Sequence, residues 1–182
     1  MADSGQLVSR QAVGEEMESA RLTFHRLLDS MSLADLRRPT IGTKWNNEEL
    51  LFHMMFGYLI VASLIPMVRL FSRLPRKFSK FFAMLLNSVT GPFNTVNYRG
   101  SRLGARVYNH SRMGAKFDKT IASLERRLSR ENDAGLGRGM HFPARWDPFF
   151  KDYMTLAELY HYPTQHFTFH SRQLSLGPEQ DG

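Results

Sequence analysis

Apolar residues recur along this chain at the three- to four-residue spacing of amphipathic helices. Between residues 8 and 31 they lie on one stripe, which predicts a helix with one face in a core. The stripe consists of Met17, Phe24, Leu28 and Met31. Pro39 and Gly42 then interrupt the pattern, so we expect a connection there.

A second helix is predicted from the stretch NNEELLFHMMFGYLIVAS. Asn46 can cap its first turn, and Glu49, three residues on, can complete a capping box. Residues 50–68 carry no charge, and about 20 apolar residues are enough to cross a bilayer. His53 inside this run and Pro66 near its end favour a buried bundle helix over a membrane span.

A seven-residue pattern predicts a third helix over residues 103–128. Two neighbouring rows of residues form one seam. The rows consist of Leu103, His110, Phe117 and Leu124, and of Val107, Gly114, Ile121 and Leu128. Prolines and glycines break the preceding residues 73–100, so we expect a long connection with a short helix. This connection either packs over one end of the helices or lies on a membrane surface through its basic and aromatic residues.

A fourth helix is predicted from Thr155, which forms a capping box with Glu158, to about Leu174. Pro163 lies inside it, where the missing backbone donor is expected to kink or restart the helix. No alternation of strand period occurs in the sequence. The pattern therefore predicts an all-α four-helix bundle, formed as a single domain over residues 1–182 with its core at about 10–175.

The composition narrows the chemistry that this chain can perform. It has 182 residues and no cysteine, which excludes disulfides, cysteine metal sites and a cysteine nucleophile. The net charge is +7, but Lys and Arg are spread along the chain, with a denser patch at 69–80, as is typical of a solvated surface. We expect a small-molecule substrate and no nucleic acid or membrane partner, and we keep a homodimer open. The first residues lack an apolar signal core, so we expect a cytoplasmic protein.

The stretch HYPTQHFTFHSRQL places two histidines four residues apart. His166 and His170 therefore lie on one helical face, where two imidazoles can hold one divalent metal. A pair of surface or hydrogen-bonded histidines is the other interpretation of this motif alone. The remaining histidines apart from His53 and His110 are expected to be surface or local structural residues: His25, His141 and His161.

His53 in the second helix offers a third ligand. It lies roughly 10 Å from the start of its helix, whereas His170 and His166 lie roughly 7 and 13 Å from the end of theirs. These depths match if the second and fourth helices are antiparallel, which requires up-down-down-up topology with a long crossover between helices two and three. Residues 73–100 can form that crossover. His110 falls at a similar depth, either as a further contact at the metal or as a hydrogen-bonded core residue. Glu49 can orient His53 or simply cap its helix.

The chain resembles the DinB/YfiT-like family, which is distinct from the DNA polymerase of similar name. The similarity rests on WNNEELLFHMMFGYLIV with Trp45 and His53, on RWDPFF before the last helix, and on YPTQHFTFHSRQL. It covers roughly residues 10–175. The resemblance implies an up-down-down-up four-helix bundle with a divalent metal, often zinc or nickel, held by His53, His166 and His170. SRQL follows the last histidine, where many members show Arg-Gly-Gln, so the substrate preference stays open.

The resemblance also implies an activity. Characterised members include transferases of low-molecular-weight thiols such as mycothiol or bacillithiol, and a mycothiol-dependent maleylpyruvate isomerase. Three neutral imidazoles leave a metal with positive charge and an open face, which activates either a thiol or water. We therefore expect a metal-dependent thiol transferase. A metal-dependent hydrolase and a non-catalytic, stress-associated bundle are the alternatives. Arg172 and Arg145 are the candidates to hold an anionic thiol cofactor, because guanidinium groups pair with carboxylates.

Overall fold

The computed structural model describes residues 9–176 and is mostly helical. Four helices are long: α1 (Arg10–Ser30), α3 (Asn47–Phe71), α6 (His110–Leu128) and α8 (Leu156–Ser171). The remaining elements are α2 (Leu33–Arg37), α4 (Arg76–Ser88), α5 (Thr90–Val107), α7 (Asp133–Leu136), β1 (Gly139–His141) and β2 (Tyr153–Thr155). The expectation of an all-α chain is therefore correct in its main feature. The start predicted at residue 8 lies outside the described residues.

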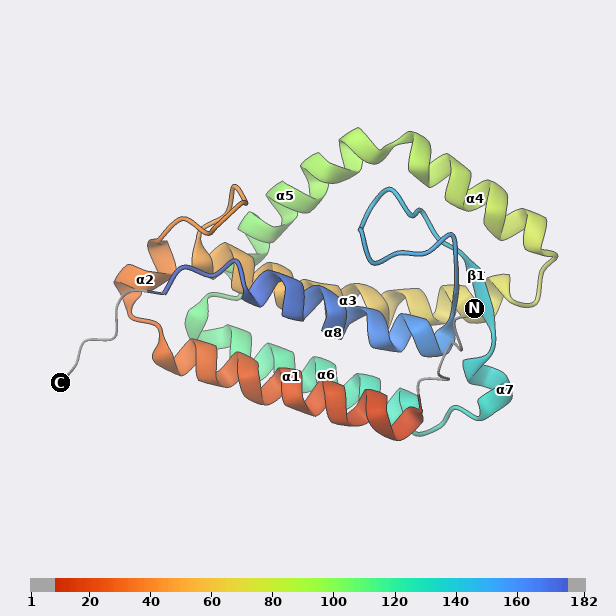
Figure 1. Cartoon of the computed structure of the whole chain (residues 1–182), viewed down its shortest axis with the longest axis horizontal. Coiled ribbons are helices and arrows are strands. Elements are labelled where there is room, and N and C mark those ends of the chain that lie inside the picture. The colour runs from red at the N-terminus through yellow and green to blue at the C-terminus, as the bar shows by residue number, and fades with distance from the viewer. Residues whose placement is uncertain (1–8, 177–182) are drawn as a thin grey trace, which may run out of the picture.

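Helices α1, α3, α6 and α8 lie side by side around one apolar core (Figure 1). Helix α3 contacts α6 and α8, and α1 contacts the same two helices. In Figure 1, α3 and α8 run in opposite directions. Aromatic rings fill the centre: Phe117 packs edge-on against Phe24 at 4.7 Å and against Tyr58 at 5.0 Å between ring centroids. This frame holds α3 and α8, the two helices with the predicted metal ligands, against each other.

The predicted caps are present in the structure. Asn46 accepts from the backbone N–H of Glu49, and the side chain of Glu49 accepts from the N–H of Asn46, which starts α3. Thr155 and Glu158 form the equivalent box at α8. Of the kink or restart expected at Pro163, the restart is wrong, because α8 runs unbroken from Leu156 to Ser171; the kink stays a prediction. The capping box and the buried residues on both sides of Pro163 hold the helix despite the one missing donor.

The predicted third helix is two helices. Helix α5 ends at Val107 and α6 begins at His110, so the seam of residues 103–128 is interrupted. Leu103 and Val107 are 63% and 51% exposed, whereas the residues of the seam from Phe117 onward are buried. The spacing of the apolar residues continues in phase across the break, so periodicity alone does not reveal it.

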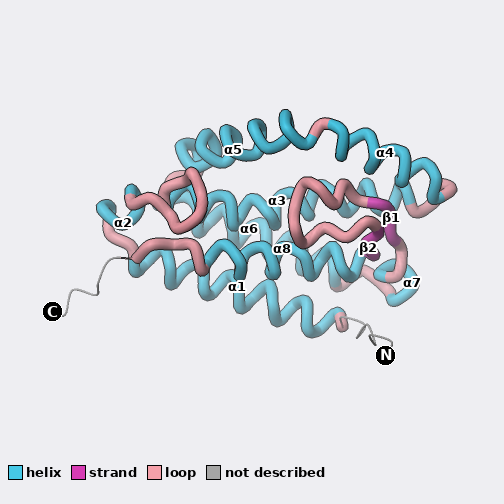
Figure 2. Tube along the Cα trace, turned by 45° about the horizontal axis from the view of Figure 1, so that its top comes forward, coloured by secondary structure: helices cyan, strands magenta, loops and turns pink. Residues whose placement is uncertain are grey.

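Residues 73–100, expected to be a connection with a short helix, instead form α4 and most of α5. The two helices meet near Val89 and arch over α3 and over the loop between β1 and β2 (Figures 1 and 2). Helix α5 approaches α3 closely at Gly104, where a Cβ would lie 2.1 Å from the ring of Phe52. A side chain at this position would force the two helices apart, so glycine permits the contact.

A short antiparallel ribbon was not predicted. It pairs Gly139 with Thr155, Met140 with Met154 and His141 with Tyr153. Three residues per strand are too few to show alternation in a sequence. The loop that this ribbon closes carries the RWDPFF stretch toward α4 and α5 (Figure 2).

Helix α3 is long and apolar enough to cross a membrane by length and composition. In the structure, 56% of its most apolar window is buried inside the protein. Its buried residues contact α5, α6 and α8. This burial is the packing expected of a bundle helix.

Candidate metal centre

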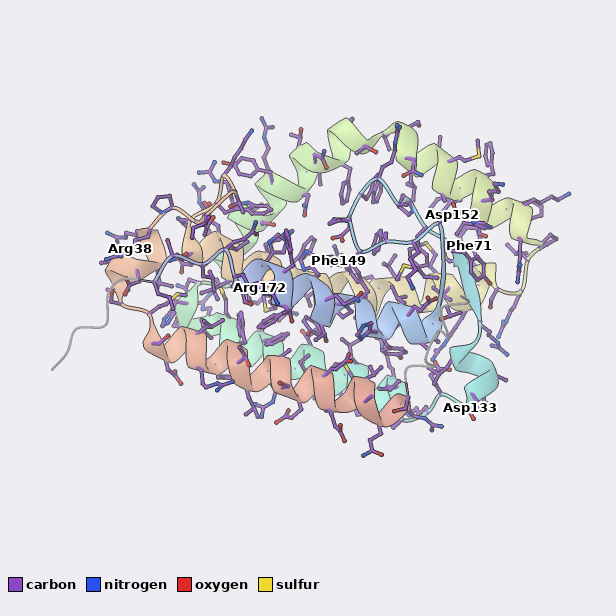
Figure 3. The ribbon with its side chains drawn as sticks, viewed as in Figure 1. Arg38, Phe71, Asp133, Phe149, Asp152 and Arg172 are labelled. Carbon is purple, nitrogen blue, oxygen red and sulfur yellow. The ribbon has the colours of Figure 1, made fainter. Side chains whose placement is uncertain are left out.

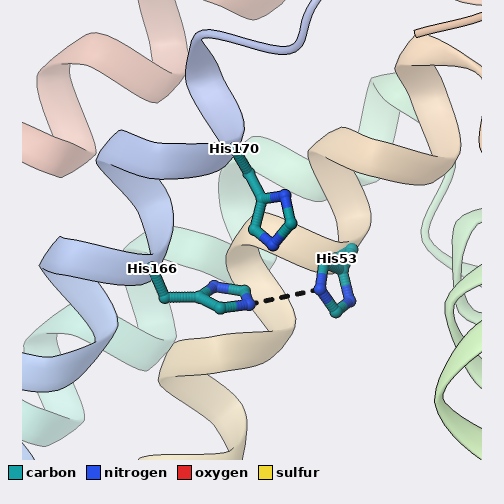
Figure 4. Close-up of side chains that lie close together, drawn as sticks. All are labelled: His53, His166 and His170. Atoms are coloured by element: carbon teal, nitrogen blue, oxygen red, sulfur yellow. Dashed lines mark hydrogen bonds between the residues drawn. The ribbon is translucent and has the colours of Figure 1, made fainter. Parts of the chain in front are cut away.

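The three histidines singled out by the sequence lie together. His53 is supplied by α3, and His166 and His170 by successive turns of α8. Each residue offers one ring nitrogen, and these nitrogens all lie within 4.8 Å of one another. The rings point toward one another, with centroids 4.5–4.8 Å apart (Figure 4).

Hydrogen bonds orient two of the rings. Nδ1 of His170 lies 2.6 Å from Oε1 of Gln173. An amide oxygen only accepts, so Nδ1 carries the proton and Nε2 keeps its lone pair. Nδ1 of His53 lies 3.1 Å from Oγ of the fully buried Ser101 on α5. The contact with Gln173 fixes the tautomer of His170, whereas the hydroxyl of Ser101 can donate or accept and orients the ring of His53.

One pair of ring nitrogens has the spacing of two ligands on one metal ion. Nε2 of His53 and Nε2 of His166 are 3.2 Å apart. Two nitrogens that bind one tetrahedral zinc ion at about 2.0–2.1 Å each lie about 3.3–3.4 Å apart. Nδ1 of His166 is buried and has no hydrogen-bond partner. A cation between the two Nε2 atoms would take up both of their lone pairs, but Nδ1 of His166 faces Gly57 and would stay without a partner.

Burial keeps all three imidazoles neutral. It lowers the pKa of His53 to about 3, with a further contribution from His170. Burial also lowers the pKa of His166 well below its usual value and lowers the pKa of His170. Neutral imidazole is the form that binds metal, so these rings need not lose a proton at neutral pH to act as ligands.

One acidic residue at the centre was not predicted. Oδ2 of Asp147 lies 3.7 Å from Nε2 of His166 and accepts a hydrogen bond of 2.8 Å from the hydroxyl of Tyr162. Its other oxygen accepts from the backbone N–H of Phe149. Burial raises the pKa of Asp147. The available signal was an acidic residue among the aromatic residues of RWDPFF.

Trp45 covers the centre on another side. Its indole ring stacks on the ring of His53 at 4.3 Å between centroids, and its Nε1 donates to the carbonyl oxygen of Tyr98 on α5. A groove of about 510 Å³ begins at this tryptophan. It is lined by Lys44, Trp45, Asn94, Thr95, Asn97, Tyr98 and Arg99.

An apolar cavity of about 390 Å³ reaches His53 and His166. His53, Asp147 and His166 are at its polar end. The rest of its wall is almost entirely apolar and comes from α3, α4, α5, β1, the β1–β2 loop and α8. These residues include Phe56, Ile60, Leu64, Met67, Phe82, Leu86, Phe93, Phe142, Trp146 and Phe150. Asn97 lines both this cavity and the groove beside Trp45.

The loop between β1 and β2 is fastened to α4 and α5 by Trp146. Its indole Nε1 donates to the carbonyl oxygen of Leu86 at 2.9 Å, and its ring stacks on Phe93 at 3.9 Å. The backbone N–H of Arg145 donates to Oδ1 of Asn87. These contacts close the roof of the apolar cavity and keep Asp147 next to the histidines.

The structure does not bring the two candidate arginines to this cavity. Arg145 is exposed on the loop. Arg172 follows the end of α8, near Phe149 (Figure 3). It lines a separate cavity with Phe149 and His161. Glu49 caps α3 and pairs with Arg102 at 3.0 Å. Ser101, rather than Glu49, contacts the ring of His53.

His110 does not lie at the centre. Its Nε2 bonds to the carbonyl oxygen of Leu28 at 2.7 Å, and its backbone N–H donates to Glu48, so it ties the start of α6 to α1 and α3. The three histidines expected to be local indeed have carboxylate partners elsewhere. The pairs are His25 with Asp118, His141 with Asp152, and His161 with Glu16.

Comparisons of the chain with protein-family models, with curated proteins and with solved structures gave no match.

Proposed function

We propose that this protein is a divalent-metal-dependent enzyme that transfers a low-molecular-weight thiol to an apolar electrophile. One observation carries the proposal: three neutral histidines converge, two of them, His53 and His166, line an apolar cavity, and the largely buried carboxylate of Asp147 lies beside them. Perturbed, buried titratable groups in a deep cavity are typical of catalytic sites. A structural histidine cluster needs neither the cavity nor the carboxylate.

The arrangement of the long helices supports the resemblance to the DinB/YfiT-like family. Helices α3 and α8 run in opposite directions, and α4 with most of α5 forms a long crossover between α3 and α6. We propose that these helices form the up-down-down-up bundle of that family, as a single domain. This arrangement is the one in which His53 and His170 reach the same depth.

His53, His166 and His170 would hold the metal, with zinc and nickel as the candidates. When bound, such an ion supplies Lewis acidity and lowers the pKa of a thiol or water that joins it. Three histidine ligands leave room for one further ligand in a tetrahedral site. Gln173 holds His170 in the tautomer that leaves Nε2 free to bind metal, and Ser101 orients the ring of His53.

Asp147 would accept the proton of the incoming nucleophile. It faces the histidines, and its raised pKa makes it a better base than an exposed carboxylate. The hydroxyl of Tyr162 and the N–H of Phe149 hold the carboxylate in place. The chain has no cysteine, so the thiol must be a separate molecule, such as mycothiol or bacillithiol.

The two hollows beside the centre suggest separate places for the two reactants. The apolar cavity has no Lys or Arg in its wall and therefore suits an uncharged, apolar electrophile. The groove beside Trp45 has Lys44 and Arg99, which can pair with the carboxylates of an anionic thiol. These two residues are better placed for that role than Arg145 and Arg172, which line neither hollow.

A metal-dependent hydrolase is the second candidate, because Asp147 can accept a proton from water as well as from a thiol. The experiment that separates the two uses metal-loaded protein purified without an affinity tag. An aromatic chloronitro electrophile is incubated with a panel of biological thiols, and an apolar nitrophenyl ester is tested in parallel. Thiol-dependent acceleration that is lost in His166→Ala and reduced in Asp147→Asn supports transfer. Metal-dependent ester cleavage without any thiol effect supports hydrolysis instead.

A further inference from the structure

The crossover helices expose an unusually apolar surface. We call residues 72–107, which comprise α4 and α5, the arm. Nine of the fifteen large apolar side chains that are exposed in the described part of the chain belong to it. They are Leu74, Phe78, Phe81, Met84, Leu85, Val89, Val96, Leu103 and Val107, between 41% and 69% exposed. Scattered single exposures are ordinary, but a concentration of this size marks an interaction surface.

The apolar residues of α4 form two separate faces. At 100° per residue, Phe78, Phe81 and Leu85 fall on one stripe of the helix. Ser79 and Ala83 lie on a different side, which is buried against the rest of the protein. Packing on the bundle and the cavity therefore explains the inner face only. The outer stripe contacts solvent in this structure.

The charge of the arm is entirely positive. It contains seven cations and no acidic residue, and no Asp or Glu occurs anywhere in residues 50–117. The cations are Arg73, Arg76, Lys77, Lys80, Arg99, Arg102 and Arg106. Among the described residues, only Arg102 of these seven forms an ion pair, with Glu49. Lys77 and Lys80 lie beside the exposed stripe of α4, so apolar and basic positions share its solvent side.

We infer that the arm docks on the surface of an anionic membrane. Amphipathic helices with Phe and Leu on one side and Lys and Arg alongside insert their apolar residues at the headgroup boundary, while the cations pair with lipid phosphates. This takes up the second of the two interpretations that the sequence left open for residues 73–100, and it departs from the expectation of no membrane partner. Docking leaves α3 inside the protein.

The charge of the arm argues against a second copy of the chain and against nucleic acid as its partner. In a two-fold dimer the same surface meets itself, so the cations of one arm would face those of the other without acidic partners. Nucleic acid would satisfy the cations but offers little to Phe81 and Leu85, because interfaces with nucleic acid are more polar than those between proteins. An anionic lipid surface satisfies both kinds of side chain.

Docking also has a consequence for the apolar cavity, and this step rests on the proposed function. Phe82, Leu86 and Phe93 of the arm line the cavity from its inner side. An arm lying on a membrane would bring this wall close to the lipid, from which an apolar substrate could partition. The docking itself depends only on the exposed surface of the arm, so it can be tested without any reference to metal or activity.

The test is sedimentation of the full-length protein with vesicles of phosphatidylcholine, with and without phosphatidylglycerol. We expect binding to the anionic vesicles that weakens as salt is added, because salt screens the cations. Two arm variants, Phe81→Ser with Leu85→Ser, and Lys77→Glu with Lys80→Glu, should each weaken binding by about tenfold or more.

Matched controls change the same kinds of residue elsewhere. Leu33→Ser with Ile41→Ser removes two side chains that are 74% and 64% exposed. Lys119→Glu with Arg126→Glu makes the same charge change on exposed positions of α6. Both controls should keep binding within about twofold of the unchanged protein. Circular dichroism and metal content show that every variant is folded.

Three outcomes would overturn the inference. The first is no binding to anionic vesicles. The second is arm variants that bind as well as the controls. The third is a dimer in light scattering that the arm variants convert to monomer, without vesicle binding, which would assign the face to a second copy. Each of these leaves the metal content unchanged, so failure of docking is distinct from failure of the proposed function.

Discussion

Gly57 offers a test of the metal centre that alters none of the proposed ligands. It lies on α3, one turn after His53, and a Cβ built there would be 3.0 Å from Nδ1 of His166. Gly57→Ala therefore introduces one methyl group directly against a proposed ligand. In the middle of a helix, the same change favours folding by about 0.8–1.0 kcal/mol, because alanine loses less conformational freedom than glycine.

The expected size of the effect follows from the geometry. Ordinary van der Waals contact with a Cβ begins at 3.4 Å, so the ring of His166 must retreat by about 0.4 Å, the difference from 3.0 Å. Metal-ligand distances tolerate about 0.2 Å. We expect zinc affinity to fall by about tenfold or more, as for other disturbances of ligand orientation. The free energy of unfolding of the metal-free protein should change by less than about 1 kcal/mol, because the gain in helix propensity offsets the tight contact.

Gly14→Ala is the matched control. A Cβ at Gly14, inside α1, meets nothing within 4 Å, so this variant gains helix propensity alone. Its thermal midpoint should rise by about 2–4 °C for each kcal/mol gained, with unchanged zinc affinity. Affinity is measured by competition with a chromophoric chelator, and stability by thermal unfolding without metal. If Gly57→Ala binds zinc as tightly as the unchanged protein, the position of His166 does not govern a metal site and the reasoning fails.

Two further predictions concern hydrogen bonds. Ser101→Ala removes the partner of Nδ1 of His53 and should weaken zinc binding by about 10- to 100-fold in the same chelator competition. Ser79 is a buried serine on α4, and Ser79→Ala should leave zinc binding unchanged. Burial opposes ionisation of Glu158, but hydrogen bonds, chiefly from Lys151, outweigh it and lower its pKa below the ordinary value of 4.5. The stability that Glu158 contributes is therefore present above about pH 4.5 and is lost as the pH falls through the lower folded pKa. The thermal midpoint of Glu158→Gln should therefore decline less steeply below pH 4.5 than that of the unchanged protein. An equally steep decline would contradict this assignment.

Local patterns in the sequence predicted the helices that hold the histidines. Asn46 and Thr155 mark the starts of α3 and α8, and both form the expected capping boxes. Caps and periodicity are decided by residues three or four apart, so they are readable from the sequence. The depth of His53 along its helix, compared with that of His166 and His170, then predicted that the three residues lie together if the two helices are antiparallel.

The features that the sequence did not predict depend on contacts between segments that are distant in the sequence. The break between α5 and α6 at Tyr108 and Asn109 arises where the chain leaves the arm to join the core, and the apolar spacing continues across it. His110 was expected at the depth of the metal, either as a further contact there or as a hydrogen-bonded core residue, because the third helix was taken to be continuous. It bonds to the carbonyl oxygen of Leu28, as in the second alternative. No pattern among neighbouring residues distinguishes one continuous helix from two helices here.

Ser101 and Asp147 show the same limit at the centre. Ser101 lies 48 positions from His53, and Asp147 reaches His166 from a loop held by contacts to α4 and α5. Partners of this kind follow from tertiary packing rather than from spacing along the chain. The two candidate arginines were chosen because they lie close in sequence to Trp146 and His170, and that closeness did not bring either arginine to the apolar cavity.

The central claim is that His53, His166 and His170 hold one divalent metal, and elemental analysis of protein purified without an affinity tag tests it most directly. The account predicts about one zinc or nickel ion per chain, and a strong loss of metal in each of the three single alanine variants, because three protein ligands are usual for a catalytic site of this kind. His25→Ala, which changes a histidine paired with Asp118, should keep its metal. Full retention of metal in all three ligand variants would contradict the account.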